Sequence, residues 1–457
     1  MDSFEYTGRW WLPSDPNTEV SGTVSYSGED GILLDLVGTL DELGAKEWHP
    51  LVLGLMRDEA RFVTLVGCRR ARLHVAFPGF TSERFRAATV YVSRYGPHFT
   101  HVDELRFRKV EVQYDHLPEW AGITGFQEHS YEDEHGRQRY RFEFVRPEPV
   151  VATTESGIVS VGFGFGYRGS VLREVSLSQS VSILIEVPEP LSFEDLYLRF
   201  IQPFRNLLTL ATGKPNWTTN VEVRVENGSS SRPSQVFFRT GHCQPTAKKG
   251  LPLSDMLFSL SDIGADFEVV VARWLSVAQD LDSVSNLFFG VQYSPEMYLE
   301  HQFLNLVQAA EVYHRRRVGN EALKRDEYKR RRKLVLESAP SGCKQWLKGQ
   351  LSNEPHLEQR IKELTDETGA VLLPLVREAG QFAKRVARTR NYLTHYNPQL
   401  RSRAVQDARL YELTRSLSFL IQACFLRELG LSAEQSASFF QRNSGYRFAL
   451  TQAQALD

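Results

Sequence analysis

Arg390-Asn391-Tyr392-Leu393-Thr394-His395 lies near the end of a stretch, Leu372 to Tyr396, that has the pattern of one amphipathic helix. Apolar residues recur there at helical spacing, which predicts a buried stripe. Because the residue before a proline avoids the α region, Asn397-Pro398 predicts the end of this helix. The stretch therefore predicts a helical C-terminal fold, with a permanent cation and a titratable imidazole in the last turns of one helix.

The sequence around this stretch continues the helical pattern. Apolar periodicity predicts helices over 267–279, 296–316, 321–337, 356–366, 371–396, 404–429 and 432–441. Helices joined by such short connections are typical of an up-and-down bundle. We therefore expect an all-α domain over residues 266–457.

The first part of the chain predicts β-structure instead. Short runs rich in β-branched and aromatic residues are separated by Gly, Pro, Asp and Ser. Such spacing predicts a twisted antiparallel sheet or a sandwich over about residues 1–190. One run, Arg137 to Val145, alternates aromatic and charged residues, as a strand with one solvent-exposed face does.

Residues 191–265 mix both patterns. Ser192, with Glu194 and Asp195 behind it, predicts the start of an apolar helix that continues to about Thr212. The strand-like runs 216–226 and 234–240 either close the sheet domain or form a small domain of their own. The whole chain therefore predicts an α+β protein, with a β-rich front, a mixed connecting segment and a helical bundle.

Composition narrows the class of protein. The chain has 457 residues, 42% of them hydrophobic, and a formal net charge of −2, so affinity for nucleic acid requires a local basic patch. The cysteines Cys68, Cys243, Cys343 and Cys424 are far apart, which argues against structural zinc and disulfides and favours a reducing cytosol. The N-terminus lacks a signal-peptide pattern, and no apolar run approaches the ~20 residues needed to span a bilayer. We expect a cytoplasmic protein without cofactor or metal.

The spacing of the motif does not by itself identify a site. Arg69 and His74 have the same spacing just after a strand-like run, and we interpret this second match as a coincidence. On one helix, Arg390 and His395 diverge by roughly 140°. Asn391 and His395 are instead i, i+4 neighbours, so the amide is placed to orient the imidazole. Either the pair only caps a helix end, or two copies of the chain pair across this helix and build a joint site.

A basic stretch from His314 to Lys333 is the second candidate. It carries about seven net positive charges in a slightly acidic chain, which predicts a surface for phosphates, with Arg315, Arg316 and Arg331 among its contacts; a solvated corner between helices is the alternative. Glu311 falls between apolar positions of the preceding helix, where a buried carboxylate needs a partner. Arg390 or His395 is a candidate partner, and a purely bracing role is the other interpretation.

Other catalytic patterns are absent or incomplete. The segment Ala211 to Pro215 lacks the leading glycine of a phosphate loop, and Gly162 to Gly166 has no helix after it, so neither is a nucleotide fingerprint. His98 and His101 lack a third ligand nearby in sequence, and no Gly-x-Ser-x-Gly occurs.

Residues 290–440, with Arg390, Asn391 and His395, resemble the HEPN superfamily, whose signature is Arg-x4–6-His with a polar residue after the Arg. The opening Gly8-Arg9-Trp10-Trp11-Leu12-Pro13 and the segment Leu207 to Gly213 resemble the ApeA-type bacterial anti-phage proteins. The likeness implies a metal-independent endoribonuclease of abortive infection that is active as a dimer or higher homo-oligomer.

This resemblance also implies roles for single residues. His395 would be the general acid/base, Arg390 would bind the scissile phosphate, and Asn391 would position the histidine or a phosphate oxygen. Attack by the ribose 2′-hydroxyl would leave a cyclic phosphate, so RNA and not DNA would be cut. Arg388 and Thr394, beside the motif, are expected to contact RNA. The β-rich front would restrain the nuclease until a phage-derived trigger binds. The rival hypothesis is a non-catalytic dimerisation or binding protein.

Overall fold

The computed structural model describes residues 1–42, 45–57, 61–94, 98–170, 172–227, 230–240 and 250–455. The chain forms two compact units, Met1–Thr212 with Asn216–Ala272, and Gly213–Pro215 with Arg273–Asp457. The predicted fold class, a β-rich region followed by a helical region, is confirmed. The division at residues 190 and 265 stays a prediction.

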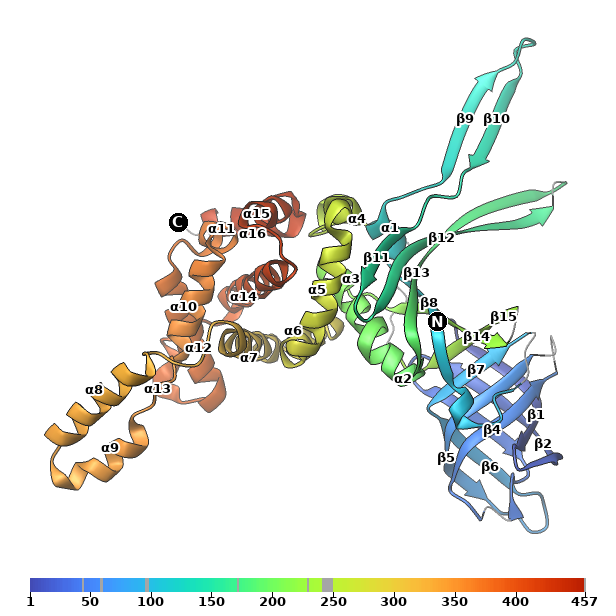
Figure 1. Cartoon of the computed structure of the whole chain (residues 1–457), viewed down its shortest axis with the longest axis horizontal. Helices are drawn as coiled ribbons and strands as arrows, with labels where there is room; N and C mark the ends of the chain where they lie inside the picture. Colours follow the sequence, from blue (N-terminus) through green and yellow to red (C-terminus); the bar gives the residue numbers. More distant parts are fainter. Residues whose placement is uncertain are drawn as a thin grey trace. The chain divides into compact units, whose positions relative to one another are not determined.

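A closed barrel forms the first part of the β-rich unit (Figure 1). Its strands are β1 (Phe4–Leu12), β2 (Asp15–Ser27), β3 (Gly31–Val37), β4 (Trp48–Met56), β5 (Phe62–His74) and β6 (Ser82–Ala87). They pair antiparallel in the order β5-β4-β1-β2-β3-β6, and β6 returns to β5. Trp10, Leu34 and Phe85 are fully buried in its core. A Cβ on Gly54 would lie 2.3 Å from the Trp10 ring, so the barrel requires glycine there.

An open sheet continues from the barrel. Its strands are β7 (Thr89–Ser93), β8 (Arg106–Tyr114), β11 (Val150–Thr154), β12 (Gly157–Ser170), β13 (Glu174–Ser192), β14 (Thr218–Asn227) and β15 (Ser230–Phe238). Strand β5 also pairs with β7, and the order from there is β7-β15-β14-β8-β13-β12-β11. The two runs whose place the sequence left open, β14 and β15, therefore lie inside the large sheet.

One strand prediction needs correction. Strands β9 (Phe126–Glu132) and β10 (Gln138–Phe144) pair only with each other and stand away from the large sheet (Figure 1). Tyr140 and Phe142 on β10 are exposed, and Phe144 stacks on Phe165 of β12 with ring centroids 4.7 Å apart. The alternating pattern therefore does not mark a strand with one buried face, because a two-stranded ribbon has no second layer to cover its aromatic side.

Among the described residues, four short α-helices and a π-helical turn accompany the sheets. They are α1 (Leu117–Ala121), α2 (Phe193–Leu196), the π-turn Tyr197–Ile201, α3 (Gln202–Thr212) and α4 (Leu260–Ile263). The predicted cap is confirmed, because the Ser192 hydroxyl accepts a hydrogen bond from the Asp195 amide at 3.1 Å.

The helical unit contains α6 to α16 and the end of α5. The helices are α5 (Phe267–Asp280), α6 (Asp282–Tyr293), α7 (Leu299–Arg317), α8 (Arg325–Ser338), α9 (Lys344–Gln350), α10 (Leu357–Glu367), α11 (Gly369–Val376), α12 (Ala379–His395), α13 (Pro398–Arg401), α14 (Asp407–Glu428), α15 (Ala433–Arg442) and α16 (Ser444–Ala455). Trp274, Phe289 and Phe425 pack edge-on and stacked where α5, α6 and α14 meet. Helices α7, α10 and α12 pack against one another, and α12 carries the motif.

The predicted helix over 371–396 is wrong at its start. It is two helices, because Arg377 adopts φ 63 and ends α11 before α12 begins at Ala379. Pro374, which lacks a backbone N–H, lies inside α11 and leaves it one hydrogen bond short. Helix α8 also starts at Arg325 rather than at residue 321, and α6, α9 and α16 were not predicted.

Candidate nuclease site

Helix α12 carries the motif at its C-terminal end. Phe382, Ala383 and Val386 bury its apolar stripe, and Leu393 continues the stripe into the motif. As predicted from Asn397-Pro398, the helix ends there: Tyr396 takes a left-handed conformation and its amide donates to the Tyr392 carbonyl at 2.6 Å. The buried Thr389 hydroxyl accepts a hydrogen bond from the Val405 amide at 3.0 Å, which fixes the loop after α12.

Arg390 is held from two sides. Its Nη2 lies 3.8 Å from Oε2 of Glu311 on α7, and its Nη1 donates to Oδ1 of Asn391 at 3.3 Å. Glu311 Oε1 also lies 3.7 Å from Arg315, so the carboxylate joins two cations. The partner of Glu311 is therefore Arg390 rather than His395. Thr394 donates its hydroxyl to the Arg390 carbonyl at 2.8 Å and so caps the same turn.

His395 takes no part in the contacts that hold Arg390. It is exposed in the last turn of α12, and it makes no hydrogen bond or ion pair with any residue that the structure describes. Asn391, expected to orient the imidazole, instead accepts from Arg390. Arg388 is exposed as well. One chain thus brings Arg390, Asn391 and Thr394 together but leaves the imidazole free to meet a group from outside the chain.

The first half of the basic stretch is paired internally. Arg315 lies 3.2 Å from Glu354, Arg316 lies 3.2 Å from Asp282, and Arg317 lies 3.1 Å from Glu428. These arginines fasten the end of α7 to neighbouring elements. They therefore offer a phosphate less charge than the sequence alone implies.

The second half of the basic stretch forms an arm. Helices α8 and α9 project as a hairpin (Figure 1) and bury none of their side chains in the described chain. Arg330 and Arg331 are tied to Glu327 at 3.0 and 2.7 Å. Hydrogen bonds from Arg331 and then Arg330 lower the pKa of the Glu327 carboxyl, so the three residues form a stable ionic cluster.

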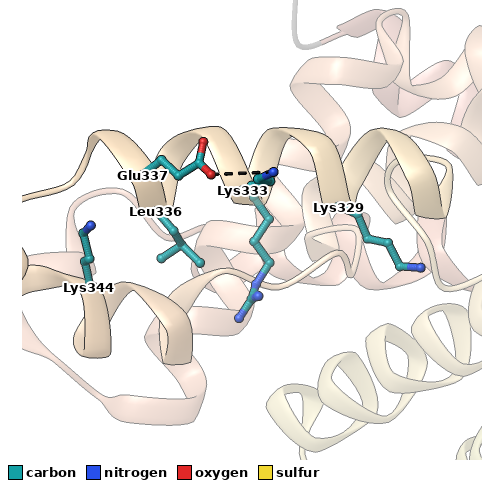
Figure 2. A pocket seen from close by; sticks show the side chains of 6 residues that line it. Lys329, Lys333, Leu336, Glu337 and Lys344 are labelled. Atoms are coloured by element: carbon teal, nitrogen blue, oxygen red, sulfur yellow. Dashed lines mark ion pairs between the residues drawn. The ribbon is translucent and has the colours of Figure 1, made fainter.

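A cleft opens between the two helices of the arm. It has a volume of about 290 Å³ and is lined by Lys329, Arg332, Lys333, Leu336, Glu337 and Lys344. Figure 2 shows that the Lys333 ammonium reaches Glu337, and the two lie 3.7 Å apart; Lys329 and Lys344 form no ion pair with the residues that the structure describes. The cleft therefore gathers Lys329, Arg332 and Lys344, three cations without an ion pair to the described residues.

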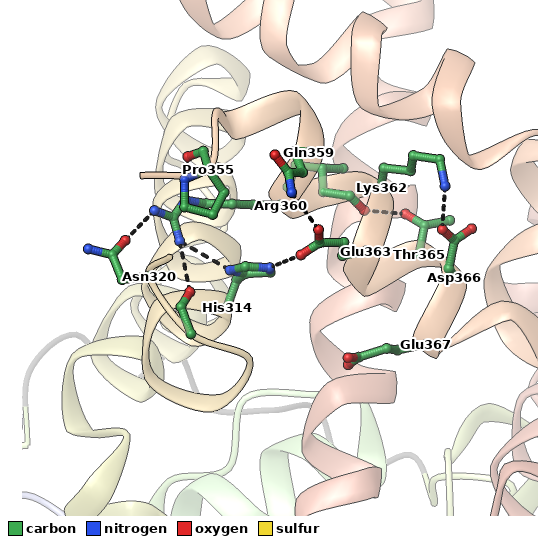
Figure 3. A network of polar contacts seen from close by, with 12 residues as sticks. His314, Asn320, Pro355, Gln359, Arg360, Lys362, Glu363, Thr365, Asp366 and Glu367 are labelled. Atoms are coloured by element: carbon green, nitrogen blue, oxygen red, sulfur yellow. Dashed lines mark hydrogen bonds and ion pairs between the residues drawn. The ribbon is translucent and has the colours of Figure 1, made fainter. Parts of the chain in front are cut away.

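Sequence reasoning missed a buried polar network. Arg360 of α10, only 1% exposed, donates to the Pro355 carbonyl at 3.1 Å and to Nδ1 of His314 at 3.1 Å (Figure 3). A guanidinium can only donate, so Nδ1 accepts and Nε2 carries the proton. Nε2 then donates to Glu363 at 2.6 Å. The sequence does contain a sign of this buried arginine, because Arg360 shares the apolar stripe of α10 with Ile361 and Leu364.

The same network shifts two pKa values. Burial, and then the charge of Arg315, lower the pKa of Arg360 against the opposing pull of nearby carboxylates. Burial alone would raise the pKa of Glu363, but hydrogen bonds from Gln359 and His314 hold it below its ordinary value. The arrangement is a charged, hydrogen-bonded clamp between α7 and α10. Glu311 lies close enough for its charge to act on Arg360.

The described residues offer no other obvious chemistry. Within the ranges given above, no cluster of three His, Cys, Asp or Glu side chains is placed to hold a metal, and no helix is long and apolar enough to cross a membrane. Cys68 and Cys424 are buried and Cys343 is exposed, while Cys243 lies outside the described residues. Burial raises the pKa of the Cys68 thiol to about 12, which leaves it unreactive.

Two family models match the chain. The model of ApeA N-terminal domain 1 matches residues 5–274, and the Apea-like HEPN model matches residues 304–435. Together they cover the β-rich unit and the helices α7 to α12 that build the candidate site. No curated protein and no solved structure matches the chain.

Proposed function

This chain belongs to the family of ApeA-type proteins, which join an ApeA N-terminal domain to a HEPN domain, and we propose that it is a metal-independent endoribonuclease of anti-phage defence. The observation that carries the proposal is the pairing of a positioned cation with an accessible imidazole on α12. Arg390 is fixed by Glu311 and Asn391, and His395 is exposed five residues later.

The chemistry follows from these two groups. His395 removes the proton from a ribose 2′-hydroxyl, the 2′-oxygen attacks the adjacent phosphorus, and the bond to the 5′-oxygen breaks. The leaving 5′-oxygen takes up a proton, so the products are a 2′,3′-cyclic phosphate and a 5′-hydroxyl. Arg390 stabilises the charge that develops on the phosphoryl oxygens, and Asn391 keeps the guanidinium in place. The reaction requires the 2′-hydroxyl, so DNA is not a substrate.

A second copy of the chain completes this site. Arg390 points toward α7 while His395 lies exposed, and their directions on α12 diverge by roughly 140°. Two α12 helices related by a twofold axis place the histidine of each copy near the arginine of the other. We therefore propose a homodimer as the active form.

RNA reaches the site over the helical unit. The cations of the arm cleft are available to phosphates, and Arg388 and Thr394 lie next to the motif. Arg315, Arg316 and Arg331 can contribute only by exchanging a carboxylate for a phosphate. The β-rich unit is the proposed sensor, which restrains the nuclease in the cytoplasm until a phage-derived trigger binds.

Infection tests this proposal. Bacteria that carry the wild-type protein should survive phage challenge as a population and show fragments of total RNA after infection. His395→Ala should abolish both while the protein level stays unchanged, because the exposed side chain supports no packing. Arg447→Ala, an exposed change on α16, is the matched control and should protect like the wild type.

The result also decides between the enzyme and the rival hypothesis. Protection that survives His395→Ala would contradict a catalytic histidine. It would favour a non-catalytic binding protein, in which Arg390 only braces α12 against Glu311.

A further inference from the structure

A groove of about 900 Å³ lies along α12 at the end opposite the motif. Its walls come from the end of α11, the first half of α12, and α14 and α16. Its volume falls in the range of roughly 300–1,000 Å³ that is usual for small-ligand sites. The groove lies wholly within the helical unit.

Two arginines of this groove have no partner of their own. Arg385 of α12 and Arg409 of α14 are exposed, and neither makes an ion pair or a hydrogen bond with the described residues. Glu378 and Glu412 are the carboxylates on the wall, set against these two arginines and two more. The groove is therefore positively charged and open to an anionic ligand.

Two aromatic rings face the same space. Tyr411 and Phe448 line the groove and remain 55% and 56% exposed, so both rings are accessible to a ligand. Arg415 lies over the Phe448 ring at 5.3 Å and donates to the Gly445 carbonyl, so the ring is held in place at the rim. A fixed, exposed ring beside unpaired guanidiniums matches the needs of a nucleobase attached to phosphates.

The groove connects to the motif along one helix face. Arg385, Arg388 and His395 project within an arc of about 80° on α12, and all three are exposed. Ten residues of helix span about 15 Å, which is the length of four or five stacked nucleotides at ~3.4 Å each. A strand anchored in the groove can therefore run past Arg388 to His395.

We propose that this groove is a nucleotide subsite that holds the RNA strand a few nucleotides from the scissile phosphate. One base stacks on Phe448 or Tyr411, and the flanking phosphates contact Arg385 and Arg409. This inference rests on the proposed nuclease function, because it assigns the strand a path to His395. RNA fits better than a second copy of the chain, because a twofold interface centred here would set these arginines against themselves.

Binding to a non-cleaving protein tests the subsite. The full-length chain with His395→Ala is titrated with a single-stranded RNA of about 12 nucleotides, followed by fluorescence anisotropy. Adding Phe448→Leu, which keeps the bulk but not the ring, should weaken binding about 5- to 150-fold, as expected for the loss of one base–aromatic stack. Arg385→Ala with Arg409→Ala should lower the salt slope of log K by about 1.4, or roughly 0.7 per lost phosphate contact.

The controls separate stacking from general damage. Arg447→Ala changes an exposed arginine next to Phe448 that does not line the groove, and it should leave both affinity and salt slope unchanged. An oligomer of abasic ribose phosphates should bind the Phe448→Leu protein and its parent equally well. Circular dichroism confirms that each variant keeps its helix content.

Two outcomes would overturn the inference. One is unchanged RNA affinity in the groove variants. The other is a change in dimerisation, seen by sedimentation, without a change in RNA affinity, which would assign the groove to a second copy. Neither outcome touches the nuclease proposal, since cleavage by the protein with His395 intact is measured separately.

Discussion

Arg360 is the residue on which the support of the candidate site depends. It is buried between α7 and α10, and four groups of the chain accept its hydrogen bonds: the Pro355 and Gly319 carbonyls, His314 and Asn320. Removing one partner from a buried charged network typically costs about 3–5 kcal/mol, because the groups left behind remain desolvated. The network lies next to Glu311, so its loss should also loosen the carboxylate that holds Arg390.

Arg360→Ala should therefore lower the free energy of local opening of α7 and α10 by about 3 kcal/mol. Amide hydrogen exchange in the full-length chain measures this energy helix by helix, which avoids treating a two-unit protein as a two-state system. Lys362→Ala is the control, because Lys362 lies on the same helix and makes only an exposed pair with Asp366 at 2.6 Å. It should leave the opening energy of α7 and α10 nearly unchanged, because exposed ion pairs contribute little to stability. Equal effects of the two variants would contradict the clamp.

At this scale the sequence located the motif but not its environment. The i, i+5 spacing alone predicts that Arg390 and His395 diverge; in the structure Arg390 pairs with Glu311, and His395 is exposed. Whether Arg390, His395 or neither would meet Glu311 depended on how α7 packs against α12, which no local pattern contains. His314 and Arg360 are 46 residues apart in the sequence, so no local pattern could predict that they form a hydrogen bond.

The arm of α8 and α9 contributes least to the core of the helical unit. Neither helix buries a side chain, while Trp346 and Leu334 stay exposed at 65% and 60% beside the cationic cleft. Short helices are marginally stable on their own in water. We therefore expect a bound ligand to stabilise the arm. Phosphates are the ligand that its charge favours.

The cleft and the ionic cluster of the arm should contribute unequally to RNA binding. Lys329→Ala, Arg332→Ala and Lys344→Ala together should lower the salt slope of log K by about 2, because three unneutralised cations are lost at roughly 0.7 each. Arg330→Ala with Arg331→Ala should lower it by less than about 1, since both cations are already paired with Glu327. Titrations of RNA at several salt concentrations in the His395→Ala protein measure both slopes. A larger effect of the second set would show that the ion pairs open to bind RNA.

Element boundaries were predictable where a local signal marked them. Ser192 and Asn397-Pro398 marked a start and an end correctly. The break at Arg377 was not predicted, because the apolar stripe runs on from Val376 to Ala379 and no glycine marks the positive φ at Arg377. The β9–β10 ribbon misled for the opposite reason, since its alternation has no buried layer behind it.

On the scale of the whole molecule, the order of β-rich and helical regions followed from periodicity alone. The closed barrel did not, because closure depends on the pairing of β1 with β4 and of β3 with β6, strands that do not follow each other in the chain. The two family matches follow the same order, with the ApeA domain over the sheets and the HEPN domain over the bundle. The proposed restraint requires two such units, one for the proposed sensing and one for the proposed cleavage.

The chemistry of the RNA products tests the central claim most directly. Purified wild-type protein is incubated with RNA, a chelator, and an extract of phage-infected cells that lack the protein, so that any trigger is supplied. We predict new fragments ending in 2′,3′-cyclic phosphate, no cutting of DNA of the same sequence, and no new fragments with His395→Ala. Equal cleavage by His395→Ala, or cleavage by the wild type that the chelator abolishes, would contradict a metal-independent nuclease centred on His395.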